Sequence, residues 1–252
     1  MLDTIDIEDI KCIALDAGEA IMKIYTQDFS IAYKDDNSPL TEADIKSNEI
    51  ICNTLEKLYP DIPIISEENK QVAFDVRKKW EYYWCIDPID GTKEFIKKNG
   101  EFTVNIALMH KNIPVLGVVY APVLQEMYSA KKGIGAFKNG DKLPLFINRN
   151  PEKLMRVVAS KSHLTDETQK FIDSLPTKKT EQISIGSSLK LCMVAEGVAD
   201  IYPRLSPTSE WDIAAAHAIV LESGKNVLQY HNGKQVVYNK ENLLNPWFIV
   251  RS

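Results

Sequence analysis

The residues best suited to chemistry in this sequence lie in the segment DPIDGT at residues 87–92. Asp87 and Asp90 place two carboxylates three residues apart at the end of an apolar strand, where side chains can face a crevice. Such carboxylates repel each other unless protons or cations lie between them, and Mg²⁺ prefers oxygen ligands of this kind and also binds phosphate. Gly91 lets the backbone approach a ligand closely, and amides at a helix start near Thr92 could meet a phosphate oxygen. Taken alone, the segment is also typical of a simple turn capped by an aspartate.

Two further acidic positions favour a metal site over a simple turn. Glu67 ends another apolar strand, and Asp212 follows Trp211 at the start of the last predicted helix. By itself, Glu67 beside Glu68 is a solvated charge pair, and Asp212 is a charge that the helix dipole favours by about 0.3–1 kcal/mol. Together with Asp87 and Asp90, however, four carboxylates at the ends of elements predict a phosphatase site for two or three Mg²⁺ ions.

These groups must be positioned by helices and strands of the first half of the chain. Apolar residues at helical spacing predict a helix over about residues 6–26. Thr41 with Asp44 resembles an N-cap pair, and the apolar face that follows predicts a helix to Tyr59. Apolar runs predict strands over 62–65, 82–86, 102–109, 113–120 and 126–130, with the later ones forming an antiparallel meander.

The second half has a different pattern. Residues 148–151 (NRNP) are the best candidate for a boundary. Beyond them, strands over 156–159 and 200–202 alternate with a helix from Thr165, a segment over 187–197 and a last helix over 212–222. Such alternation is typical of an α/β unit. We therefore predict an α+β half over 1–150, with most of the acidic site, and an α/β half over 151–252, with its last carboxylate.

Composition excludes several classes of protein. The chain has 252 residues and 30 basic against 35 acidic side chains, so the formal net charge of −5 disfavours binding to a long nucleic acid. No apolar run reaches the roughly 18–20 residues that a membrane span needs. The N-terminus is acidic, and the four cysteines lie far apart without a CxxC pair. We expect a cytoplasmic protein, and attachment to the inner face of the cell membrane stays open.

The two acidic segments resemble the signatures of a known family, the inositol-monophosphatase-like, lithium-sensitive phosphatases. Residues 87–95 (DPIDGTKEF) are similar to the first signature and residues 211–215 (WDIAA) to the second, while 67–68 and 41–44 lie where the family places its other acidic residues. One departure is Gly224-Lys225, where the second signature closes on two small residues. The resemblance covers nearly the whole chain and implies a layered sandwich of alternating helices and sheets, the sugar-phosphatase fold.

Further segments resemble the bacterial 3′(2′),5′-bisphosphate nucleotidases of the CysQ type. They are residues 91–97, 99–105, 117–122 and 184–190. The resemblance implies that Glu67, Asp87, Asp90 and Asp212 bind Mg²⁺, together with the backbone carbonyl of Ile89. It implies also that one metal, with Glu67 among its ligands and helped by Thr92, activates a water, and that Asp44 accepts the proton through Thr92. The alternative for Asp44 is simply to complete a capping box.

The resemblance places the substrate-binding residues mainly in the second half of the chain. Lys190 and Arg204 could contact a 5′-phosphate, Arg204 with bidentate geometry, although most single Lys and Arg residues are solvated. The implied substrate-binding set is Gly91, Thr92, Ser160, Ser162, His163, Gly186, Ser187, Ser188, Lys190, Tyr202, Arg204 and Asp212.

The leading hypothesis is a Mg²⁺-dependent phosphatase that removes the 3′-phosphate of adenosine 3′,5′-bisphosphate, a nucleoside bisphosphate by-product of sulfate assimilation, as a monomer or homodimer. An inositol monophosphatase or a sugar bisphosphatase on the same fold is a neighbouring alternative. A non-catalytic nucleotide sensor is an alternative of another class.

Overall fold

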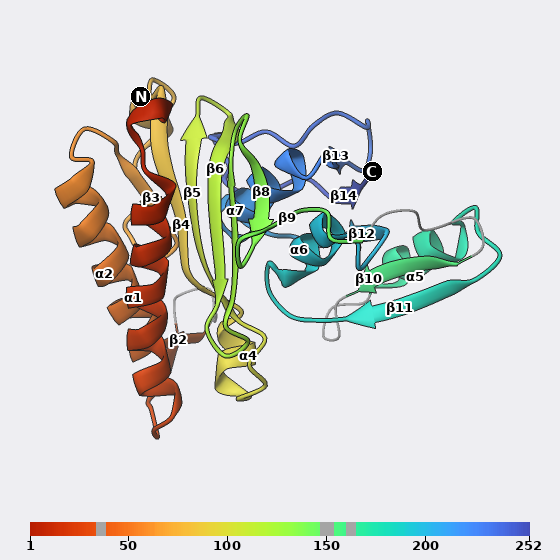
Figure 1. The fold of residues 1–252 in the computed structure, drawn as a ribbon, viewed down its shortest axis with the longest axis horizontal. Helices are drawn as coiled ribbons and strands as arrows, with labels where there is room; N and C mark the ends of the chain where they lie inside the picture. Colours follow the sequence, from red (N-terminus) through yellow and green to blue (C-terminus); the bar gives the residue numbers. More distant parts are fainter. Residues whose placement is uncertain (34–38, 147–153, 160–164) are drawn as a thin grey trace.

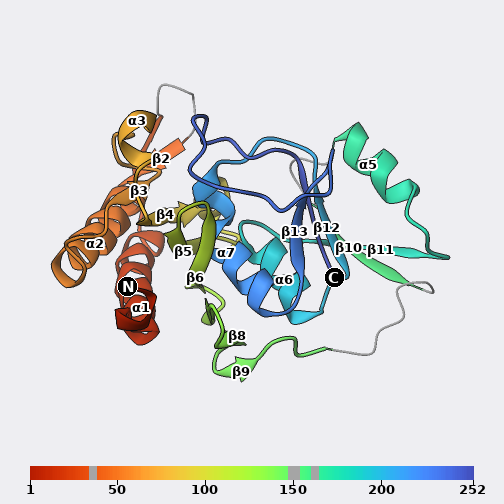
Figure 2. The same cartoon turned by 90° about the horizontal axis from the view of Figure 1, so that it is seen from above.

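The computed structural model describes residues 1–33, 39–146, 154–159 and 165–252. Figures 1 and 2 show five layers, in the order helices, sheet, helices, sheet, helix. α1 and α2 cover one face of a seven-stranded sheet, α7 and α6 lie between this sheet and a five-stranded sheet, and α5 packs beyond the second sheet. The alternating helix and sheet layers predicted from the sequence are thus confirmed.

The first layer pairs α1 (Ile7–Tyr25) with α2 (Glu42–Leu58). Asp6 caps α1, since its side chain accepts a hydrogen bond from the backbone N–H of Glu8 (3.0 Å). The buried residues of α1 recur at helical spacing and form one apolar face against the sheet. Both predicted helices are therefore confirmed to within about two residues. Before α2 lie η1 (Leu2–Thr4) and the short pair β1 (Ile31–Tyr33) and β2 (Pro39–Thr41).

The seven-stranded sheet has the order β3-β4-β5-β6-β7-β8-β9. Only β3 and β4 are parallel in this sheet, and the remaining neighbours are antiparallel, as the predicted meander requires. The bounds are β3 Ile64–Ser66, β4 Tyr82–Asp90, β5 Thr103–His110, β6 Ile113–Ala121, β7 Glu126–Lys131, β8 Gly135–Lys138 and β9 Asp141–Lys142. Two short helices accompany it: α3 (Phe74–Arg77), and α4 (Thr92–Ile96) after β4.

β4 is longer than its apolar run indicates, because the strand continues through the two aspartates. Asp87 pairs with Asn105 and Asp90 pairs with Thr103, so three steps along β4 match two along β5. The extra residue makes a β-bulge. Side chains three residues apart point to opposite faces of a regular strand, and the bulge removes this alternation. Asp87 and Asp90 can therefore line the same cavity.

The five-stranded sheet has the order β11-β10-β12-β14-β13, with β10 parallel to both neighbours. Its bounds are β10 Met155–Ala159, β11 Thr180–Ser184, β12 Ile201–Arg204, β13 Asn226–Gln229 and β14 Phe248–Arg251, and its helices are α5 Asp166–Asp173, α6 Leu189–Glu196 and α7 Glu210–Glu222. The predicted boundary at 148–151 lies outside the described residues.

α7 belongs to the second half of the chain but packs on β6, β4 and β5 of the first sheet. It begins at Glu210, two residues before the predicted start, with Ser209 as its N-cap. The close approach needs Gly117 on β6, where an added Cβ would lie 2.1 Å from the carbonyl oxygen of Ala215. Small buried residues on α7 allow the same contact. In the parts of the chain described, no helix is both long and apolar enough to cross a membrane.

Candidate active site

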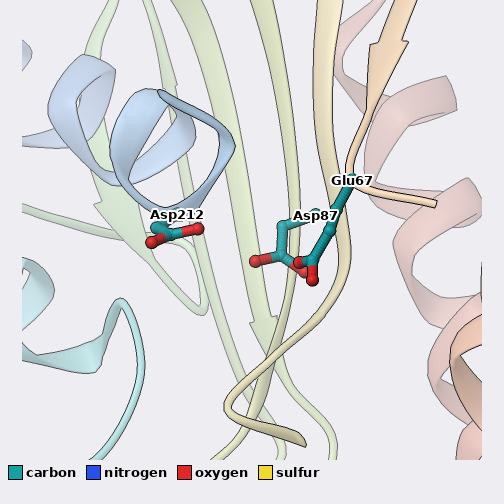
Figure 3. Close-up of side chains that lie close together, drawn as sticks. All are labelled: Glu67, Asp87 and Asp212. Atoms are coloured by element: carbon teal, nitrogen blue, oxygen red, sulfur yellow. The ribbon is translucent and has the colours of Figure 1, made fainter. Parts of the chain in front are cut away.

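Three carboxylates from distant parts of the sequence meet at one end of the seven-stranded sheet. Glu67 follows β3, Asp87 lies on β4, and Asp212 lies in the first turn of α7 (Figure 3). One oxygen from each lies within 4.8 Å of the others. These residues and Asp90 line a cavity of about 190 Å³. The structure therefore brings together all four carboxylates that the sequence analysis singled out.

Burial and mutual repulsion disfavour ionisation of this cluster. Burial raises the pKa of Asp87 well above its usual value, and the charges of Glu67, Asp90 and Asp212 raise it further. Burial also raises the pKa of Asp90, against the nearby Lys190 ammonium and hydrogen bonds from Ser188 and Asn105. Burial and the neighbouring Asp90 raise the pKa of Asp212 to about 8. A cation at the centre would offset this repulsion, and a set of hard oxygen donors fits a divalent ion such as Mg²⁺.

The face of α2 that points toward the site holds the segments on which these carboxylates lie. Asp44 Oδ2 accepts hydrogen bonds from the N–H and the hydroxyl of Thr41 (2.7 and 2.6 Å), while its Oδ1 accepts one from the Thr92 hydroxyl (3.2 Å). Asp44 thus completes the capping box and contacts Thr92 at the same time, so its two suggested roles are compatible. One turn further, the Ser47 hydroxyl donates to the carbonyl of Pro88 (2.9 Å). Asn48 Oδ1 accepts from Ser66, the residue before Glu67 (2.7 Å).

The turn between β4 and α4 presents backbone groups to the cavity. Asp87 Oδ1 accepts a hydrogen bond from the N–H of Ile89 (3.1 Å). The carbonyl of Ile89 lies 3.3 Å from the Thr92 hydroxyl and is an alternative acceptor to Asp44 for its one proton. Gly91 has φ +96°, a left-handed conformation that favours glycine. The predicted start of a helix at Thr92 is confirmed. The bulge and this turn therefore place the Ile89 carbonyl close to the Thr92 hydroxyl.

A larger cavity of about 360 Å³ adjoins the first and shares Asp90, Gly91, Glu94 and Asp212 with it. Its lining includes most of the predicted substrate-binding residues: Gly91, Gly186, Ser187, Ser188, Lys190, Tyr202, Arg204 and Asp212. Ser160, Ser162 and His163 lie outside the described residues.

Two basic residues of this second cavity, Lys190 and Arg204, have buried polar atoms. Lys190 is 9% exposed, and burial lowers its pKa to about 8 against the opposing effect of Asp90. Arg204 donates from Nη2 to the carbonyl of Pro207 (3.0 Å), whereas its buried Nε has no hydrogen-bond partner within the described parts of the chain. The same is true of the buried Ser187 hydroxyl. Buried donors without acceptors are costly unless a ligand satisfies them, so this wall suits an anion.

Several residues of the site were not singled out from the sequence. Ser47, Asn48 and Asn105 contact the site residues from behind, and Glu94, Lys97, Asn99 and Glu101 line the larger cavity. Five of them, Glu94, Lys97, Asn99, Glu101 and Asn105, lie in the segments 91–97 and 99–105 that resemble the CysQ type, and Asn105 also alternates with Thr103 as a polar residue in an otherwise apolar strand. Ser47 and Asn48 carry no such signal, because they occupy helix positions where a solvated polar side chain is common.

Comparison with known proteins agrees with this geometry. A model of the inositol monophosphatase family matches residues 1–247. The chain belongs to this family. Phosphatases of the inositol monophosphatase family use metal ions, and the acidic cluster at Glu67, Asp87 and Asp212 could bind them.

Relatives within the family match almost the full chain. The 3′(2′),5′-bisphosphate nucleotidase CysQ of Salmonella typhimurium is 47% identical over 247 residues, which cover 97% of this chain and 98% of that protein. The Haemophilus influenzae protein of the same name is 35% identical, covering 97% and 91%. The crystal structure of CysQ from Bacteroides thetaiotaomicron has a TM-score of 0.86 at 46% identity, covering 95% of this chain and 94% of that one.

Proposed function

We propose that the protein is a Mg²⁺-dependent phosphatase that hydrolyses the 3′-phosphate of adenosine 3′,5′-bisphosphate, giving AMP and phosphate. The observation that carries the proposal is the junction of two cavities that share Asp90 and Asp212: one is acidic, and the other has Lys190 and Arg204 on one wall. A substrate with one phosphate to be cleaved and a second to be held fits such a pair. The nucleotidases named above, at 47% and 35% identity, support the same reading.

In this proposal, Glu67, Asp87, Asp90, Asp212 and the carbonyl of Ile89 hold two or three Mg²⁺ ions. Bound Mg²⁺ would lower the pKa of a water and offset the negative charge of the phosphoryl oxygens. The carboxylates fit this role because one oxygen each of Glu67, Asp87 and Asp212 lies within 4.8 Å of the others. Asp87 is also only 2% exposed. A bound cation would offset the repulsion that raises the pKa of Asp87.

Thr92 and Asp44 supply the proton path. The Thr92 hydroxyl donates to Asp44 Oδ1 (3.2 Å), so its lone pairs are free to accept a hydrogen bond from a water in the cavity. As that water attacks the phosphorus in line, its proton passes to Thr92 while the Thr92 proton passes to Asp44. Asp44 keeps a fixed position meanwhile, because Thr41 holds its other oxygen. Glu67 would orient the same water from the opposite side.

The second cavity holds the rest of the nucleotide. Lys190 and the unpaired Arg204 Nε would bind the 5′-phosphate, with the Ser187 hydroxyl as a further donor. Gly186 allows its loop to approach the segment between α4 and β5, since an added Cβ would lie 2.6 Å from the carbonyl oxygen of Glu101. Tyr202 lines the same wall and could contact the nucleoside.

The direct test is phosphate release from adenosine 3′,5′-bisphosphate by the purified protein with and without Mg²⁺. Rapid release that depends on Mg²⁺ is expected, and no release by metal-loaded protein would refute the proposal. The same assay with inositol 1-phosphate and fructose 1,6-bisphosphate separates the neighbouring alternatives. Binding without turnover would favour the sensor, against which the intact contact between Thr92 and Asp44 argues.

A further inference from the structure

A chain of hydrogen bonds connects the Asp90 carboxylate with the backbone of Asp212 through a buried side chain behind them. Asn105 on β5 is fully buried (0% exposed), and its Nδ2 donates to Asp90 Oδ2 (3.4 Å) and to the Ser188 hydroxyl (2.9 Å). Ser188 donates in turn to the backbone carbonyl of Asp212 (2.5 Å). One side-chain amide thus links the bulge of β4, the residue that precedes α6 and the first turn of α7.

Thr103 fixes the orientation of this amide. It lies two residues before Asn105 on the same face of β5, it is fully buried, and its hydroxyl donates to Asn105 Oδ1 (3.0 Å). The amide NH₂ is therefore left to face Asp90 and Ser188. A reversed amide would set its oxygen against the Asp90 carboxylate, and an ionised carboxylate can only accept.

We propose that Asn105, oriented by Thr103, is a positioning residue that holds Asp90 in place for metal binding and keeps Ser188 at the wall of the substrate cavity. The inference rests on the proposed function, since it concerns the Mg²⁺ site of that reaction. Asp90 and Ser188 both line the larger cavity, while Asn105 acts through them from behind. A purely structural Asn105 would affect the stability of the protein and leave its affinity for Mg²⁺ unchanged.

The test is a calorimetric titration of the metal-stripped protein with Mg²⁺, with the melting temperature measured alongside. Loss of a residue that orients a metal ligand typically weakens metal binding by about 10–100-fold, and we expect this for Asn105→Ala. Thr103→Val is nearly isosteric and removes only the orienting hydroxyl, so about fivefold weaker binding is expected from the loss of one neutral hydrogen bond. Thr103→Ser keeps the donor and should restore most of the affinity.

A matched control removes a buried hydroxyl elsewhere in the same sheet. Ser129 on β7 is 2% exposed, and Ser129→Ala should bind Mg²⁺ as the wild type does. If Asn105→Ala fails to fold, the comparison of Thr103→Val with Thr103→Ser decides. Wild-type affinity for Mg²⁺ in folded Thr103→Val would overturn the inference, even with a lowered melting temperature. Failure of the wild type to bind Mg²⁺ or to release phosphate would instead overturn the proposed function.

Discussion

Neutralising one site carboxylate should stabilise the metal-free protein while removing its response to Mg²⁺. Asp212→Asn is the suitable change, because an asparagine oxygen can still accept the hydrogen bond that Asp212 Oδ2 receives from the N–H of Ser209 (2.9 Å). The helix cap is thus retained and only the charge is lost. Stability and metal binding are expected to move in opposite directions.

The size and sign of this effect follow from the raised pKa of Asp212. Between its ordinary pKa of 3.8 and about 8, the folded protein binds more protons than the unfolded chain, so the free energy of unfolding falls as the pH rises through this window. A shift of about 4 units sets an upper bound of about 6 kcal/mol. Because neighbouring carboxylates share the repulsion, we expect about 1–3 kcal/mol at pH 8, or about 3–10 °C in melting temperature.

The assay is thermal unfolding in chelator and in excess Mg²⁺, between pH 5 and pH 8.5. In chelator, the melting temperature of Asp212→Asn should exceed that of the wild type at pH 8, and the difference should shrink as the pH falls to 5. In Mg²⁺, only the wild type should gain stability. The control is Asp200→Asn, whose carboxylate also accepts a backbone N–H (2.7 Å from Arg156) but lies outside the cluster. Equal melting temperatures of Asp212→Asn and the wild type in chelator at pH 8 would show that the cluster is not electrostatically strained.

Three further predictions concern the reaction. Thr92→Val should lower kcat by about 10²–10⁴-fold with little change in Mg²⁺ affinity, because the hydroxyl between the water and Asp44 is lost. An unchanged kcat in steady-state kinetics at saturating Mg²⁺ would contradict the proton path. The Mg²⁺ affinity measured by calorimetry should rise from pH 6 to pH 8, since Asp212, with its pKa of about 8, must release its proton for the ion to bind. An affinity that does not change with pH would exclude this link between proton release and metal binding. Lys190→Met should raise the KM for adenosine 3′,5′-bisphosphate about 10–100-fold, because a charge-assisted hydrogen bond to the 5′-phosphate is removed. The KM for adenosine 3′-monophosphate should stay nearly unchanged. Equal effects on both substrates would contradict a contact between Lys190 and the 5′-phosphate.

Much of the fold could be predicted because its elements carry strong local signals. The long helices α1 and α2 have clear caps and a helical apolar spacing, and the central strands are continuous apolar runs. The strands β11, β13 and β14 were not predicted, and β11 is a half-exposed, polar edge strand whose sequence lacks the apolar run of a buried strand.

The identity of the site carboxylates was predictable, but their arrangement was not. The bulge in β4 depends on the register with Asn105 and Thr103, which no local pattern of β4 encodes. The capping box of Asp44 and its contact with Thr92 read as alternatives in the sequence, because only the structure shows that the two oxygens of one carboxylate serve different partners.

The contact of Gly117 with Ala215 has a mechanical consequence. α7 is covalently part of the second half, yet its backbone is seated directly on β6, without intervening side chains that could rearrange. Asp212 therefore keeps a fixed place relative to Asp87 and Asp90 on β4, and Ser188, which precedes α6 and donates to the Asp212 carbonyl, is held to the same unit. The arrangement of the site carboxylates is thus built into a contact between two backbones, and it is preserved from one turnover to the next.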